Sequence, residues 1–276
     1  MISIDITPEE RKTGQLAPEK MITAIQAMAE DGVVALRQAI DVVPVDELGA
    51  KMLADLARYA ELAEIDNNFQ GLRPPPLHPF LFPELVFNEP AIAISRAILG
   101  TGATLTSYGA NTAFVGSQTQ QVHADAVPPQ PNPCAPCTLL VINIPLVDMT
   151  EANGATIYWP GTHQDGRLHS GNRFPTEAMI AEWQAKRPAE RVLAQRGDLV
   201  IRDMRIWHGG MPNYTQTHRP MLALVHRHAK SAQGTFVAEA GSEDFWSSHP
   251  LLQTTPTFVP KPIDYLHQGH SRPSKQ

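Results

Sequence analysis

The sequence predicts a mainly β domain, either a sandwich or a barrel, with helical cover on one side. Apolar residues recur at helical spacing through much of the first hundred of its 276 residues. After Gly100 the pattern changes to short runs rich in Val, Ile, Leu, Thr and aromatic residues, which favour strands. Turn signals such as Asn153-Gly154 and Pro160-Gly161 separate those runs. Helices followed by strands need not form two domains, because helices often cover one face of a sheet.

The N-terminal part contains three expected helices and one strand. The helices span residues 17–32, 43–63 and 89–99, and the strand spans residues 33–38. Gly32 is a stop signal for the first helix. The residues that we expect on the apolar helix faces are Met21, Ile22, Ile25, Met28, Leu48, Met52, Leu53 and Leu56.

The β region contains five expected strands, at residues 103–115, 137–147, 155–159, 198–203 and 220–228. A polar stretch at 164–190 looks like an insertion with a short helix at 176–186. Proline clusters at 73–79 and 127–133 predict loops, because proline lacks the N–H group that helix and sheet interiors require.

Composition limits the classes of partner. The net charge is −6 and no segment carries a dense run of Lys and Arg, so a nucleic-acid partner is not expected. We find no apolar run with the length of a signal peptide or of a membrane-spanning helix. We therefore expect a soluble cytoplasmic protein that binds neither nucleic acid nor membrane, as a monomer or a homodimer.

The two cysteines, Cys134 and Cys137, form a single CxxC in the stretch PCAPC. Two cysteines exclude a secreted disulfide scaffold. A CxxC can be half of a zinc site or a redox pair, but prolines flank and interrupt this one and a strand follows it. We favour a plain turn with two small thiols, and keep a zinc or redox protein as an alternative.

The stretch QTQQVHADAVPP (residues 118–129) contains the strongest chemical signal. Residues two apart on an extended chain point to the same side, so His123 and Asp125 project together. A third ligand must come from another strand. The best candidate is His208, which follows the strand 198–203 and precedes two glycines. Two histidines and one carboxylate form the facial triad typical of non-haem Fe(II) oxygenases.

Arg219 lies eleven residues after His208 and opens the last expected strand. Pro220 biases Arg219 towards an extended conformation. A hairpin between the two strands would return Arg219 to the side of the metal site. A buried guanidinium at that position can hold a carboxylate through two parallel hydrogen bonds.

The region from residue 118 to 228 resembles the phytanoyl-CoA dioxygenase family of Fe(II)- and 2-oxoglutarate-dependent oxygenases. The matching pieces are His123-Ala124-Asp125, EANGATIYWPGTH (151–163), GDLVIRD (197–203), and His208 with Arg219. The resemblance implies a double-stranded β-helix, the cupin-like jelly roll, within one domain over residues 1–276. Residues 1–100 would form the helical cover and first strands, 101–230 the core with the metal site, and 231–276 a C-terminal extension.

The resemblance also implies roles for single residues. His123, Asp125 and His208 match the iron ligands and so the catalytic centre. Arg219 matches the residue that binds the distal carboxylate of 2-oxoglutarate, and Gln120 and Thr156 match further co-substrate contacts. Fe(II), 2-oxoglutarate and O2 would be the cofactor and co-substrates. The implied reaction couples decarboxylation of 2-oxoglutarate to oxidation of an unactivated C–H bond by hydroxylation, desaturation, epoxidation or rearrangement.

Two departures bear on the substrate. Asn143 and Gly210 stand where acyl-CoA hydroxylases of the family carry a tryptophan and a serine. The stretch RDMRIWHGGMPN (202–213) is similar to fungal members that tailor natural products. We therefore expect a small hydrophobic metabolite of secondary metabolism as the substrate. An acyl-CoA hydroxylase and a non-catalytic jelly-roll module that has kept its metal are the alternatives.

Other polar residues are expected to have structural roles. His163 is interpreted as structural or as a neighbour of the ligands, and His226 and His228 as structural or pocket-lining. Arg202 and Arg205 are expected to make ion pairs with Asp203 or with carboxylates around Asp198. Asn67 and Asn68 could reach the barrel mouth.

Overall fold

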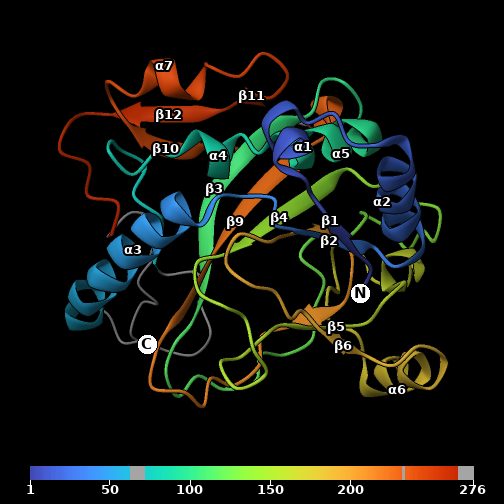
Figure 1. Cartoon of the computed structure of the whole chain (residues 1–276). Coiled ribbons are helices and arrows are strands. Elements are labelled where there is room, and N and C mark those ends of the chain that lie inside the picture. The colour runs from blue at the N-terminus through green and yellow to red at the C-terminus, as the bar shows by residue number, and fades with distance from the viewer. Residues whose placement is uncertain (63–71, 232–233, 267–276) are drawn as a thin grey trace.

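The computed structural model describes residues 1–62, 72–231 and 234–266 (Figure 1). Its helices are α1 (Pro8–Thr13), α2 (Pro18–Glu30), α3 (Val42–Leu62), α4 (Pro83–Val86), α5 (Glu89–Leu99), α6 (Glu177–Lys186) and α7 (Glu243–Trp246). Its strands are β1 (Ser3–Asp5), β2 (Val33–Arg37), β3 (Thr104–Ala113), β4 (Leu139–Pro145), β5 (Ile157–Tyr158), β6 (Glu190–Arg191), β7 (Leu199–Asp203), β8 (His208–Gly209), β9 (Arg219–Arg227), β10 (Phe236–Glu239), β11 (Gln253–Thr254) and β12 (Pro256–Val259).

Two facing sheets build a jelly roll. The larger sheet has the order β1-β2-β7-β4-β9-β3-β11, and its central strands pair antiparallel. The smaller sheet has the order β6-β5-β8. Strands far apart in the sequence lie side by side in both, as is typical of the double-stranded β-helix. A parallel pair, β10 with β12, lies beside this core (Figure 1).

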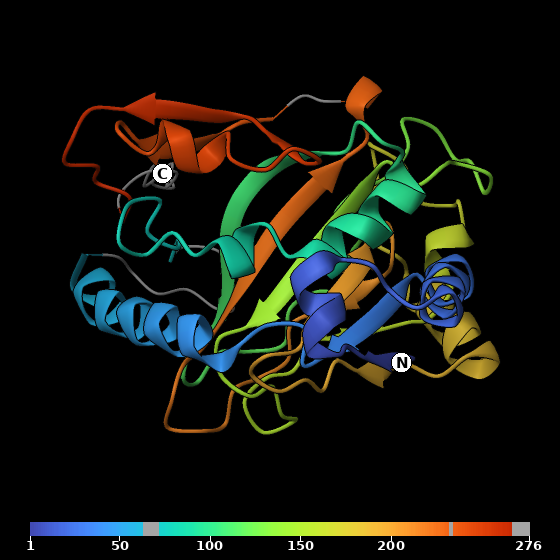
Figure 2. The same cartoon turned by 45° about the horizontal axis from the view of Figure 1, so that its top comes forward.

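Alternation along the strands sorts side chains between two environments. On β4, Leu140, Ile142 and Ile144 face the helical side and join the main apolar core. Val141 and Asn143 face the interior between the sheets, where they line cavities. The period of two residues in a strand is the cause of this division. Helices α2, α3 and α5 close the outer face of the large sheet (Figure 2).

The predicted helices and strands are largely confirmed. The three expected N-terminal helices correspond to α2, α3 and α5, and the short helix in the insertion corresponds to α6. The six expected strands correspond to β2, β3, β4, β5, β7 and β9. The elements that sequence analysis missed are β1, α1, α4, β6, β8, β10, α7, β11 and β12. Most of these span two to four residues, too few to show a hydrophobic period.

The expected core face of the first helix is wrong at two positions. Ile22 is 56% exposed and Ile25 is 39% exposed, whereas Ala24, Ala27 and Met28 are buried. Helix α2 packs against α5 and β2. Its alanine face allows that close approach, so the bulkier isoleucines are left towards solvent.

The C-terminal segment packs on the jelly roll. Strand β11 pairs in parallel with β3 and so forms an edge of the large sheet. Trp246 of α7 is 2% exposed, and its ring lies 5.3 Å from that of Tyr108 and 4.8 Å from that of Phe236, between centroids. These contacts make the expected extension a part of the core in the described residues. No helix in the described part of the chain is long and apolar enough to span a membrane.

We expect Leu222→Ala to lower the free energy of unfolding by about 2–5 kcal/mol, because it leaves a cavity in a well-packed core. Leu222 of β9 is fully buried on the helical side of the large sheet. Urea denaturation followed by circular dichroism measures the change. The control is Leu193→Ala, since Leu193 is 46% exposed and should cost less than about 0.5 kcal/mol. Equal costs for the two variants would contradict the assigned core.

Candidate metal centre and adjoining cavity

A backbone bridge brings the two predicted histidines together. The His123 N–H donates to the His208 carbonyl, and the His208 N–H donates to the His123 carbonyl, both at 2.9 Å. The two imidazole centroids are 4.4 Å apart. Gly209 makes this approach possible, because a Cβ there would lie 3.0 Å from the Gln120 carbonyl oxygen.

Asp125 completes the group on the same side of the chain as His123. Its Oδ1 lies 3.3 Å from His123 Nε2, and its Oδ2 lies 3.3 Å from His208 Nε2. The three potential ligand atoms all fall within 4.8 Å of one another. Among the described residues, no other group of three or more His, Cys, Asp or Glu side chains has metal-binding geometry. The structure thus brings together the three residues that the sequence predicts as ligands.

Hydrogen bonds at Nδ1 orient both imidazoles. His123 Nδ1 lies 2.9 Å from the Gln121 carbonyl, and His208 Nδ1 lies 3.1 Å from the Ile206 carbonyl. In His123 we assign the proton to Nδ1, because the carbonyl can only accept. His208 Nδ1 lies between this kind of acceptor and the Arg202 guanidinium, which can only donate. The Nε2 atoms of both rings face the Asp125 carboxylate. Burial, together with the nearby Arg202, lowers the pKa of His208 to about 3, so this ring is neutral as a metal ligand requires.

Arg202 contacts two of the three candidate ligand residues. Sequence analysis did not predict these contacts. Its Nη2 donates to Asp125 Oδ2 at 2.8 Å, and its Nη1 lies 3.1 Å from His208 Nδ1. The expected pairing with Asp203 is wrong for Arg202 and correct for Arg205, whose Nη2 is 2.6 Å from Asp203 Oδ2. Alternation along β7 could have predicted that Arg202 faces the cavity, because residues two apart on a strand share a face and Val200 also lines it.

The electrostatics of the group favour a cation. Burial opposes ionisation of Asp125, but the Arg202 guanidinium holds the pKa of its carboxyl well below the usual range. Since Arg202 occupies Oδ2, Oδ1 is the oxygen left for a metal. Two imidazole nitrogens and one carboxylate oxygen are a donor set that suits Fe(II) and leaves open coordination positions. The residues present therefore fit the iron that the resemblance implies.

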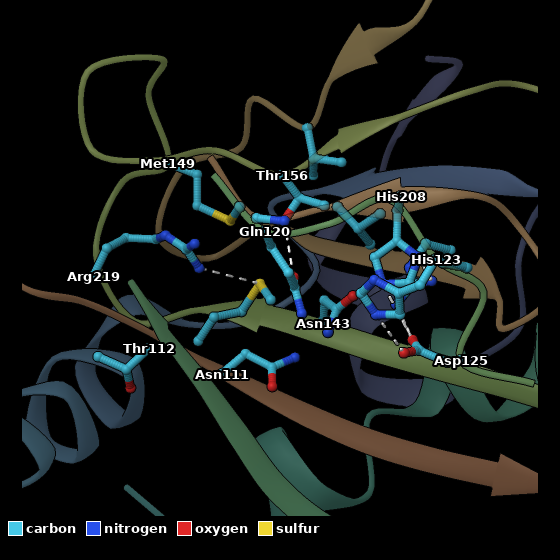
Figure 3. Close-up of a pocket in the computed structure, with 15 residues that line it drawn as sticks. Asn111, Thr112, Gln120, His123, Asp125, Asn143, Met149, Thr156, His208 and Arg219 are labelled. Atoms are coloured by element: carbon cyan, nitrogen blue, oxygen red, sulfur yellow. Dashed lines mark hydrogen bonds and ion pairs between the residues drawn. The ribbon is translucent and has the colours of Figure 1, made fainter. Parts of the chain in front are cut away.

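A narrow cavity of about 50 Å³ starts at this group and ends at Arg219. Figure 3 shows Arg219 at the opposite side of the cavity from His123, Asp125 and His208, with Gln120 between them. The lining also includes Thr156, as predicted. Residues that sequence analysis did not assign to it are Asn111, Thr112, Asn143, Met149, Val192, Val200 and Met221.

Arg219 is a buried cation without a carboxylate partner among the described residues. It is 3% exposed, and burial lowers its pKa to about 10. Its Nη2 donates to the Gly154 carbonyl at 3.0 Å, Nη1 lies 4.0 Å from Met221 Sδ, and Nε has no hydrogen-bond partner. Gly154 has φ +85°, and a Cβ there would lie 2.5 Å from the Met211 carbonyl oxygen, so only glycine fits. A buried guanidinium in this state is costly unless an anion joins it.

Gln120 is fixed by two contacts with Gly210. Its backbone N–H donates to the Gly210 carbonyl, and its Oε1 accepts from the Gly210 N–H, both at 2.9 Å. Because Oε1 is occupied, Nε2 is the donor that Gln120 directs into the cavity (Figure 3). Gln120 therefore lies at the cavity, and its expected contact with the co-substrate stays a prediction.

Among the described residues, His163, His226 and the two cysteines lie outside the group. His163 Nε2 lies 3.2 Å from the Ala29 carbonyl, and His226 Nδ1 lies 2.8 Å from Ser95 Oγ. Cys134 and Cys137 are free thiols, and the metal-type group of the described residues includes neither. Asn67 and Asn68 lie outside the described residues.

Family comparison agrees with this geometry. The model of the family described as Phytanoyl-CoA dioxygenase (PhyH) matches residues 26–221, which contain the His-Asp-His group and Arg219. The chain belongs to the phytanoyl-CoA dioxygenase family. The match runs from α2 to the start of β9, so strands of both facing sheets lie within it.

Individual relatives agree with the family match. The protein named Dioxygenase af480, from Aspergillus fumigatus, is 26% identical over 170 residues, which are 58% of this chain and 52% of that relative. The chain thus spans about half the length of this curated relative. The crystal structure of AviO1 from Streptomyces viridochromogenes Tue57 has a TM-score of 0.55 at 20% identity, with 79% of this chain and 100% of that chain covered.

The apoform structure of EctD from S. alaskensis has a TM-score of 0.57 at 17% identity, with 77% of both chains covered. At these identities, AviO1 and EctD show a shared fold. They confirm the predicted jelly roll with helical cover.

We expect His123→Ala and His208→Ala to weaken Fe(II) or Co(II) binding by more than about 100-fold. Each change deletes one of three ligands, and loss of an outer partner alone costs roughly 10- to 100-fold. Anaerobic calorimetric titration measures the affinity. The matched control is His228→Ala, because His228 Nδ1 accepts from the Lys230 N–H outside the group. Equal losses in all three variants would contradict the assigned ligand set.

We expect Arg202→Gln to weaken metal binding by about tenfold, because Asp125 loses the donor that holds Oδ2 and orients Oδ1. The same anaerobic titration measures this loss. Arg205→Gln is the control, since the Arg205 guanidinium pairs with Asp203 away from the ligands. An Arg202→Gln variant with unchanged affinity would show that this ion pair does not orient Asp125.

Proposed function

We propose that this protein is an Fe(II)- and 2-oxoglutarate-dependent dioxygenase that oxidises an unactivated C–H bond of a small organic metabolite. The single observation that carries the proposal is the placement of Arg219. A buried guanidinium without a carboxylate faces a metal-type group across one narrow cavity (Figure 3). A short dicarboxylic acid matches both ends of that cavity.

Each end of 2-oxoglutarate would meet a group suited to it. Its keto acid end would lie at His123, Asp125 and His208, where three coordination positions remain open. Its distal carboxylate would accept hydrogen bonds from Arg219, whose Nε is unpartnered in the described residues. The pairing would offset the cost of burying the Arg219 charge, which supports an anionic occupant over a neutral one.

The protein's own contribution is positioning. Gln120 Nε2 and the side chains of Thr156 and Asn143 line the cavity between its two ends and supply polar contacts along the co-substrate. Arg202 orients the Asp125 carboxylate and keeps it ionised. When bound, Fe(II) would supply the oxygen-activating redox chemistry that side chains lack. The narrow cavity leaves little room for water that would compete with the reaction.

The choice between alternatives depends on the same residues. A non-catalytic module has no need for a buried cation opposite its metal, so Arg219 favours catalysis. The relative from Aspergillus fumigatus carries the name dioxygenase, which also supports a catalytic role for this protein. Asn143 and Gly210 in place of the tryptophan and serine of acyl-CoA hydroxylases favour a secondary metabolite over an acyl-CoA.

The test uses protein reconstituted with Fe(II) and 2-oxoglutarate without oxygen. We expect a visible charge-transfer band from the chelated keto acid, and succinate when oxygen is admitted. For Arg219→Met we expect 2-oxoglutarate affinity to fall about 10- to 100-fold, which is about 1.5–3 kcal/mol for a charged hydrogen bond. Fe(II) affinity should remain, because the three ligands are intact.

Thermal unfolding tests the role of Arg219 independently, because the variant that loses 2-oxoglutarate affinity should not lose stability. Without 2-oxoglutarate, Arg219→Met should be as stable as the wild type or more so, since it removes an unpaired buried charge. Added 2-oxoglutarate should then stabilise the wild type alone. Arg196→Met is the control, because Arg196 is an exposed residue paired with Asp46. Unchanged 2-oxoglutarate affinity in Arg219→Met would overturn the co-substrate assignment.

A further inference from the structure

A second and larger cavity adjoins the metal centre. Its volume is about 260 Å³, and it shares Asn111, Asp125 and Arg202 with the narrow cavity. It extends along the inner faces of β3 and β9, past the paired residues Gly109 and Ala223. If 2-oxoglutarate fills the narrow cavity, this larger space is the one left for a substrate within reach of the metal.

Small side chains create the space. Gly109 and Ala223 lie opposite each other on adjacent strands, and a Cβ added at Gly109 would meet its nearest neighbours at 3.6 and 3.7 Å. These are ordinary contacts, so a side chain at Gly109 would extend into the cavity without displacing the backbone. The pair therefore determines how large a ligand the cavity accepts.

The charged residues of this lining are Arg73, Asp125 and Arg202. The Arg202 guanidinium is already paired with Asp125. Arg73 has no ion pair or hydrogen bond among residues 1–62, 72–231 and 234–266. The two carboxylates of 2-oxoglutarate would offset a divalent metal at the centre. Arg73 therefore leaves the cavity with one positive charge that Asp125, already paired with Arg202, does not balance.

Neutral polar groups reinforce this character. Ser107 and Asn111 of β3, and Thr235 before β10, contribute to the same lining. Thr235 Oγ1 already bonds the Thr255 carbonyl at 2.6 Å. A purely apolar ligand would leave Ser107, Asn111 and Arg73 without partners once water is displaced, which is unfavourable. An acidic ligand would satisfy the guanidinium and the polar side chains together.

We propose that this cavity is the substrate site and that the substrate is a small organic acid, whose carboxylate or phosphate group binds Arg73. The inference rests on the proposed function and deepens it. It replaces the expectation of a simply hydrophobic metabolite with a molecule that has an anionic group at one end. The carbon to be oxidised would then lie towards Asp125, at the other part of the cavity.

The probes are para-fluorobenzoate, para-fluorobenzyl phosphate and the neutral para-fluorobenzamide. The wild-type protein is loaded with Mn(II) and saturating 2-oxoglutarate, and fluorine NMR records the paramagnetic broadening of each probe near the metal. We expect one or both anions to bind at least about tenfold more tightly than the amide. This is the gain in affinity expected from one hydrogen bond to a charged group. Comparison of the two anions distinguishes a carboxylate substrate from a phosphate.

Variants locate the interaction. Arg73→Gln should remove the preference for the anion, and Arg73→Lys should keep part of it. Gly109→Leu should abolish broadening of every probe while 2-oxoglutarate still binds. Lys186→Gln is the control, because it removes one positive charge on exposed α6 and should change nothing.

The possible outcomes distinguish failure of the acidic-substrate proposal from failure of the proposed dioxygenase function. Loss of 2-oxoglutarate binding to the metal-loaded wild type would overturn the proposed function. Normal 2-oxoglutarate binding with equal affinity for anion and amide, or an anion preference that survives Arg73→Gln, would overturn the acidic substrate alone.

Discussion

The antiparallel backbone pairing of His123 with His208 is the constraint on which the site depends. Two reciprocal hydrogen bonds of 2.9 Å join a loop after β3 to β8, and they set the distance between the two imidazoles. Asp125 then follows from local geometry, because it lies two residues beyond His123 on extended chain. Gln120 continues the same pairing through Gly210. One non-local bridge therefore positions the ligands and a cavity-lining side chain together.

Charge is distributed unevenly inside the barrel. Asp125 is the carboxylate in the described lining of the two cavities, and the same linings contain the three cations Arg73, Arg202 and Arg219. Each cation has a different status: Arg202 is paired with Asp125, Arg219 is buried without a carboxylate, and Arg73 lies in the larger cavity without a described partner. The unpaired charge of Arg219 is buried and therefore costly, and Arg73 is half-buried, so this arrangement favours a protein whose ligands are anions.

The fold separates that polar interior from the stabilising core. Alternation along the strands turns Leu140 and Ile142 towards the helices, while Val141 and Asn143 line cavities on the other face. Large apolar side chains are concentrated on the helical side, so the inner face can carry arginines, asparagines and glycine. Stability and ligand binding thus depend on opposite faces of the same strands.

The sequence by itself determined the central strands and the three main helices, because periodicity along the chain carries that information. It also predicted His123, Asp125, His208 and Arg219, from residue type, spacing and the family resemblance. It misplaced Ile22 and Ile25, since a helix bearing alanines can bury either face. Only the tertiary structure decided that Arg202 contacts Asp125, that β11 joins the large sheet beside β3, and that Arg73 shares a cavity with Asp125. Those contacts join segments far apart in the chain, and no local pattern records such pairings.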